Sequence, residues 1–106
     1  MRLEILHVPD CPGAAVLEDR LVEALADRPA AEVARRVIAT QEEAEQTGMA
    51  GSPTLLLDGT DPFAGPGQEL GISCRLYRDA DGRLGPAPSV AQLHAVLDAA
   101  TYGEPL

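Results

Sequence analysis

The chain has few cysteines, no lysine and no long apolar run. Only two cysteines, Cys11 and Cys74, occur among its 106 residues, too few for a disulfide-stabilised scaffold. No apolar run approaches the roughly 20 residues that cross a membrane. Glu4 interrupts the N-terminal apolar run, where a signal peptide would have uncharged residues. We therefore expect a cytoplasmic protein whose thiols stay reduced unless they are used in chemistry.

Positive charge is also scarce. Eight arginines stand against 17 acidic residues, and the net charge is −9. Nucleic acids and anionic membranes attract clustered basic side chains, so neither is an expected partner. The acidic surplus is typical of a solvated surface, and the lack of lysine and asparagine is typical of a GC-rich genome. With 45% apolar residues, the composition suits one small folded domain.

The apolar pattern predicts alternating strands and helices. Short apolar runs predict four strands, at residues 3–8, 32–39, 54–57 and 74–78. Spacings of three and four residues predict three helices, at residues 13–27, 41–47 and from 90 onward. A glycine- and proline-rich loop is expected at residues 59–73 and a flexible tail at 102–106.

Local signals place the helix starts. Thr40 with Glu43, and Ser89 with Gln92, have the spacing of capping boxes. Pro12 suits the first turn of the first helix, because its missing N–H is not needed there. Cys11 therefore falls at or next to the N-cap of that helix.

The element order β-α-β-α-β-β-α predicts one α/β domain over residues 1–106. A strand, a crossover helix and a second strand imply a parallel pair. The third and fourth strands have no helix between them, so we expect them to be antiparallel. The predicted fold is a mixed four-stranded sheet flanked by helices.

This order resembles the thioredoxin-like superfamily, with Cys11 at the first strand–helix junction and Ser52-Pro53-Thr54 entering the third strand. Three segments, Pro9-Asp10-Cys11-Pro12, Asp61-Pro62-Phe63 and Ser73-Cys74-Arg75-Leu76-Tyr77, sharpen the likeness. Together with the Ser-Pro-Thr segment they resemble a group of small bacterial thioredoxin-like proteins, some of which carry selenocysteine at a motif cysteine.

The resemblance implies redox chemistry and assigns roles to particular residues. Cys11 would be the nucleophile, and Pro53 a cis-proline that packs beside it and presents backbone to the substrate. Pro12, Ser52 and Thr54 would line the substrate site. The motif also departs from the superfamily, because Ala14 stands where a thioredoxin has its second cysteine and Asp10 replaces the usual aromatic residue. A general dithiol reductase acting at this motif alone is therefore not expected.

The residues around each cysteine also indicate what its thiol could do, independently of the resemblance. A helix N-terminus favours the thiolate of Cys11, whereas the adjacent Asp10 opposes a second negative charge. Cys74 is a candidate resolving thiol if the loop folds back over the first helix. The alternatives, a small buried side chain for Cys11 and a packed strand residue for Cys74, remain open. His7 and His94 have no zinc-ligand spacing to either cysteine.

Three functions remain open. The first is a thiol redox protein, a thiol–disulfide oxidoreductase, with Cys11 as nucleophile and Cys74 or an external thiol as resolver. The second is the binding of soft metals such as mercury, or cleavage of organomercurials, with two thiols and the Asp10 carboxyl. The third is a non-catalytic interaction module. We expect no cofactor, a partner that carries a thiol or disulfide, and a monomer or weak homodimer.

Overall fold

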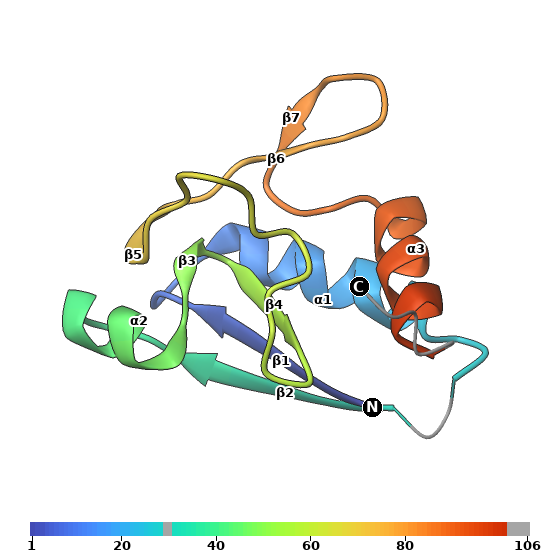
Figure 1. The fold of residues 1–106 in the computed structure, drawn as a ribbon, viewed down its shortest axis with the longest axis horizontal. Coiled ribbons are helices and arrows are strands. Elements are labelled where there is room, and N and C mark those ends of the chain that lie inside the picture. The colour runs from blue at the N-terminus through green and yellow to red at the C-terminus, as the bar shows by residue number, and fades with distance from the viewer. Residues whose placement is uncertain (29–30, 102–106) are drawn as a thin grey trace.

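A three-stranded mixed sheet forms the centre of the molecule. The computed structural model describes residues 1–28 and 31–101, arranged as in Figure 1. β1 (Arg2–His7) lies between β2 (Glu32–Val37) and β4 (Thr54–Leu57). β2 runs parallel to β1, whereas β4 runs antiparallel to it. The prediction of a mixed α/β fold is therefore confirmed.

The predicted fourth strand of this sheet is wrong. Residues 74–78 do not join the central sheet. β5 (Gly71–Cys74) pairs in parallel with β3 (Ala50–Ser52), and β6 (Tyr77–Arg78) pairs antiparallel with β7 (Leu84–Gly85). Between β5 and β6, the side chain of Arg75 turns inward to the loop, where it meets Asp61. The segment is therefore held by its pairing with β3 and β7 and by the contact of Arg75 with the loop, and it forms no ladder with β4.

The helices of the described chain cover the two faces of the sheet unequally. α1 (Pro12–Ala24) and α3 (Val90–Thr101) lie together over one face (Figure 1). They share a core with β1 and β4, whose largest members are Leu3, Ile5, Leu17, Leu21, Leu55, Leu93 and Leu97. α2 (Gln41–Thr47) packs on the opposite face, in a smaller cluster formed by Leu6, Ile38, Ala44, Met49 and Leu56.

The predicted capping box at Ser89 is confirmed, and Thr40 caps α2 as predicted, although the Glu43 carboxylate reaches back to the Ala39 N–H at 3.2 Å. The backbone N–H of Glu43 donates to Thr40 Oγ1 at 3.1 Å, which begins α2. The backbone N–H of Gln92 donates to Ser89 Oγ at 3.1 Å, and Gln92 Oε1 accepts from the Ser89 N–H at 2.9 Å. Gly48 ends α2 with a φ of 86°, a left-handed conformation that glycine adopts without a steric penalty. The ends of these helices are therefore set locally by the sequence.

β2 is exposed along its whole length. None of its six residues is buried, whereas Leu3, Ile5 and Leu6 of β1 are fully buried. The strand ends at Val37 instead of residue 39, and Ile38 just beyond it is buried. Within residues 1–28 and 31–101, no strand pairs with the outer edge of β2. The strand therefore forms an open edge of the central sheet.

The expected flexible tail at 102–106 falls outside the described residues. α1 itself ends at Ala24 rather than at residue 27. Among the helices that the structure does describe, none combines the length and the apolar character needed to cross a bilayer.

Candidate functional site

Cys11 is the N-cap residue of α1, as its position before Pro12 predicts. Asp10 turns the chain after β1 with a φ of 57°, a left-handed conformation that aspartate tolerates better than most residues. Cys11 itself is extended, with φ −78° and ψ 111°, and its thiol makes no capping hydrogen bond. The side chain is half-buried against the larger core cluster. Its sulfur is therefore not committed to the helix end and is partly open to solvent.

The first turn of α1 packs directly on Pro53. A Cβ atom added to Gly13 would lie 2.9 Å from Pro53 Cδ and 2.9 Å from the Pro86 carbonyl oxygen. Such separations are too short for real carbon atoms, so the close approach requires glycine at this position. This contact brings the helix that begins at Cys11 against the dipeptide that the resemblance singles out.

The Ser52–Pro53 peptide bond is cis, and the residues around it are buried. The Ser52 hydroxyl accepts a hydrogen bond from the Val8 N–H at 2.9 Å. The Thr54 hydroxyl donates to the Gly51 carbonyl at 2.6 Å. Both hydroxyls, predicted to line a substrate site, are therefore already used within the fold. The Pro53 ring is also covered, so its side chain is placed to position α1 rather than to touch a substrate.

Cys74 lies on the other side of the same dipeptide. It is the register partner of Ser52 in the β3–β5 pair, and its side chain is exposed. The Arg75 N–H donates to the Ser52 carbonyl at 3.0 Å, and the Gly71 N–H donates to the Met49 carbonyl at 2.9 Å. The backbone edge that the resemblance assigns to a substrate is therefore occupied by the chain's own segment, and that segment carries the second cysteine.

A buried arginine, to which the sequence assigned no role, holds this segment in place. Arg75 is 7% exposed and forms an ion pair with Asp61 at 2.8 Å. It also donates to Thr54 Oγ1 at 3.2 Å and to the Phe63 carbonyl at 3.1 Å. Its guanidinium lies 4.6 Å from the centre of the Tyr77 ring. One sequence signal was available, because Arg75 and Tyr77 are two apart and face the same way in an extended segment.

Tyr77 links the arginine to the cis-proline. Its hydroxyl donates to the Pro53 carbonyl, and its ring meets Phe63 edge-on with centroids 5.9 Å apart. Burial raises the pKa of Tyr77 well above its ordinary value; the Arg75 cation opposes this, and the negative charges of Asp61 and Cys11 add to it. Because Gly13 in the first turn of α1 also packs on Pro53, Tyr77 and the helix that begins at Cys11 contact the same proline.

The remaining candidate residues lie outside this arrangement. Asp10 and Pro12 are exposed, and Asp10 has no hydrogen-bond partner among the described residues. His7 is buried, with Nδ1 2.8 Å from the Val8 carbonyl, the geometry of a donating Nδ1–H. Within the part of the chain that the structure describes, no three histidine, cysteine or acidic side chains are grouped closely enough to hold a metal ion.

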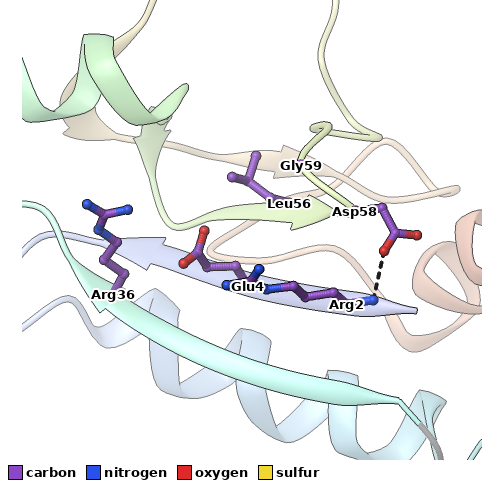
Figure 2. A pocket seen from close by; sticks show the side chains of 6 residues that line it. All are labelled: Arg2, Glu4, Arg36, Leu56, Asp58 and Gly59. Carbon is purple, nitrogen blue, oxygen red and sulfur yellow. Dashed lines mark hydrogen bonds between the residues drawn. The ribbon is translucent and has the colours of Figure 1, made fainter.

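Two of the surface cavities that the described residues form are lined by charged side chains. One, of about 480 Å³, lies beside Tyr77 between α1, the β6–β7 hairpin and the start of α3, and Arg20 and Arg83 line it. The other, of about 450 Å³, lies on the sheet face opposite α1. Figure 2 shows the second cavity, with Arg36 rising from β2 beside Glu4 on β1. Only the first cavity adjoins the residues around Pro53.

Comparison of the chain with family models, with curated proteins and with solved structures finds no match. The assignment of chemistry to this protein therefore has to come from the arrangement around Pro53.

Proposed function

We propose that the protein carries out thiol–disulfide exchange, with Cys11 as the attacking thiol and Cys74 as the resolving thiol. One observation carries the proposal: the helix that begins at Cys11 and the strand that carries Cys74 both contact the same buried dipeptide. Cys11 approaches it through the first turn of α1, which packs on Pro53. Cys74 approaches it as the register partner of Ser52.

The position of Cys11 supports it as the attacking group, because the residue is partly exposed at the start of α1. The Cys11 thiol makes no capping hydrogen bond, so it is not tied to the helix end. The first turn of α1 also contains no acidic residue. Cys74 is more exposed than Cys11, which suits a second, resolving thiol.

The exchange proceeds in two balanced steps. The Cys11 thiolate attacks one sulfur of a substrate disulfide, forming a mixed disulfide and releasing the other substrate sulfur as a thiolate that takes a proton. The Cys74 thiolate then attacks Cys11 Sγ, forming a Cys11–Cys74 disulfide and releasing the second substrate thiol. The substrate disulfide is reduced to two thiols, and the protein dithiol is oxidised to a disulfide.

The occupied edge of β3 favours a small substrate. An extended peptide cannot pair with β3 at Ser52, because Arg75 already bonds to that carbonyl. A low-molecular-weight disulfide needs no such pairing. We therefore propose such a low-molecular-weight disulfide as the preferred partner of Cys11.

Intact-mass spectrometry of the reduced protein and three variants tests the mechanism. The reduced wild type, treated with a small dicarboxylate disulfide, is expected to lose two hydrogens as the internal bridge forms. Cys74→Ser is expected to stop at a stable mixed disulfide on Cys11. Cys11→Ser is expected to react many times more slowly, and the double Cys11→Ser, Cys74→Ser variant is the unreactive control.

Other outcomes would point to the competing functions. A wild type that accumulates the mixed disulfide on Cys11 without forming a bridge would remove Cys74 from the mechanism. Equal, slow labelling of both cysteines by iodoacetamide would support a non-catalytic interaction module. Tight stoichiometric binding of Hg(II) that either cysteine variant abolishes, with no disulfide exchange, would support soft-metal handling instead.

A further inference from the structure

The outer edge of β2 has the features of a strand-pairing surface. All six of its residues are exposed, and Val33 and Val37 are among the exposed large apolar side chains of the described chain. Its N–H and C=O groups on that side meet no other described strand. Free strand edges of this kind are templates for pairing with another chain, and natural proteins usually cover or interrupt them. Neither proline nor glycine interrupts this one.

The backbone fixes which residues can bond outward. The N–H groups of Glu32 and Ile38 donate to the carbonyls of Met1 and His7, on the β1 side. Donors directed to one neighbour recur at every second residue of a strand. The N–H and C=O groups of Val33, Arg35 and Val37 therefore face the open edge, so a partner strand must bond to these residues.

The charges on β2 favour one partner and one register. We propose that β2 pairs antiparallel with β2 of a second copy of this chain, with Ala34 opposite Ala34 on the two-fold axis. Glu32 then lies opposite Arg36 of the second copy, and the symmetry makes this ion pair twice. Val33 lies opposite Arg35 of the second copy, where the outward backbone groups of both residues bond to each other.

Neighbouring registers are less favourable. A shift by two residues in one direction places Arg35 opposite Arg35 of the second copy, which sets like charges against each other. A shift in the other direction places Glu32 opposite Ala34 and gives up both ion pairs. Charge thus selects the Ala34-centred register from those that the backbone allows.

The residues that would form the ion pairs are free to do so. Glu32 is the register partner of Arg2, and Arg36 is that of Leu6, so both side chains stand on the sheet face opposite α1. Figure 2 shows Arg36 on this face. In the described chain neither Glu32 nor Arg36 has a side-chain partner, whereas Arg35, on the other face, pairs with Glu18 at 3.4 Å. The pairing would join two central sheets into one six-stranded sheet.

Sedimentation velocity tests the pairing. The protein concentration should run from micromolar to millimolar, because an interface made by one strand edge is small and is expected to be weak. The wild type is expected to form a dimer as concentration rises. Glu32→Arg and Arg36→Glu are each expected to raise the dimer dissociation constant by about tenfold or more, since each puts like charges opposite one another twice. The double variant is expected to restore the wild-type dissociation constant.

A control variant and a second readout keep the test decisive. Glu69→Arg makes the same charge change on an exposed loop residue and is expected to leave dimerisation unchanged. Hydrogen exchange is expected to show concentration-dependent protection at the Val33 and Arg35 amides but not at Ala34, whose amide already bonds to β1. A wild type that stays monomeric throughout the series, or a double variant as weak as the single ones, would overturn the proposal.

Discussion

The hydroxyl of Tyr77 makes the stability of the fold sensitive to alkaline pH. Burial raises its pKa above the ordinary value of about 10, against the opposing effect of Arg75. Above about pH 10 the unfolded chain loses this proton while the folded chain keeps it. Unfolding then releases a proton, so the contribution to stability is fully present below about pH 10 and is lost as the pH rises further.

Tyr77→Phe tests this linkage. The variant loses the hydroxyl that donates to the Pro53 carbonyl, and we expect it to be about 1–2 kcal/mol less stable at neutral pH. It should also lose less stability than the wild type on going from about pH 9 to about pH 11, because the titrating phenol is gone. Urea denaturation at a series of pH values measures both effects. If both proteins lost the same amount of stability at alkaline pH, Tyr77 would not be the group responsible for the pH dependence.

The ion pair of Arg75 and Asp61 is buried, so each charge destabilises the fold if the other is removed. The side chains are 6% and 8% exposed. Asp61→Asn would leave a buried cation without its carboxylate, and we expect a loss of about 3 kcal/mol in the free energy of unfolding. Removing both charges, as in Asp61→Asn with Arg75→Met, should cost less than the sum of the single changes.

Asp81→Asn is the matched control for the same chemical change, because Asp81 is exposed and lies outside the Arg75 cluster. It should shift the free energy of unfolding by no more than about 0.5 kcal/mol. Urea denaturation of the wild type, Asp61→Asn, Arg75→Met and the double variant gives the coupling energy directly. Additive losses would mean that Arg75 and Asp61 do not act as a pair.

At the scale of elements, the contact between α1 and Pro53 is the most constrained. Gly13→Ala improves helix propensity, but its new Cβ would meet Pro53 Cδ and the Pro86 carbonyl at 2.9 Å. We expect a net loss of about 1–3 kcal/mol, because neither neighbour is a flexible side-chain end. The rate of Cys11 alkylation should change as well, since the helix end must move.

Gly65→Ala is the control, because no atom lies within 4 Å of a Cβ built at Gly65. Its stability and its Cys11 alkylation rate should match those of the wild type. Thermal unfolding of both variants measures their stability, and iodoacetamide kinetics measure their Cys11 alkylation rates. If Gly13→Ala behaves like Gly65→Ala, the first turn of α1 is not held by Pro53.

At the scale of the whole molecule, the central sheet is covered well on one face and partly on the other. α1 and α3 bury one face with β1 and β4, whereas α2 covers one end of the opposite face. The uncovered end carries charged side chains from β1 and β2, as Figure 2 shows for Arg2, Glu4 and Arg36. The open edge at β2 and the occupied edge at β3 differ because only β3 has a segment of its own chain to pair with.

Much of the local structure was predictable from the sequence. The strand at residues 54–57, the starts of α2 and α3 and the position of Cys11 at the start of α1 follow from signals within a few residues. The fourth strand was not predictable in the same way. The alternating pattern from Cys74 to Arg78 is compatible with a sheet strand, but its actual partners are distant in sequence: β3 for Cys74, and Asp61, 14 residues away, for Arg75.

The candidate site also combines features that the local sequence predicts with contacts that only the tertiary structure shows. The sequence by itself determined that one cysteine stands at a helix start and that a serine–proline pair precedes a buried strand, because caps and turns depend on adjacent residues. Only the tertiary structure decided that Gly13 touches Pro53 and that Cys74 lies in register with Ser52. It also decided that the Ser52 and Thr54 hydroxyls face inward. These are contacts between distant segments, and packing and hydrogen-bond satisfaction over the whole chain select them.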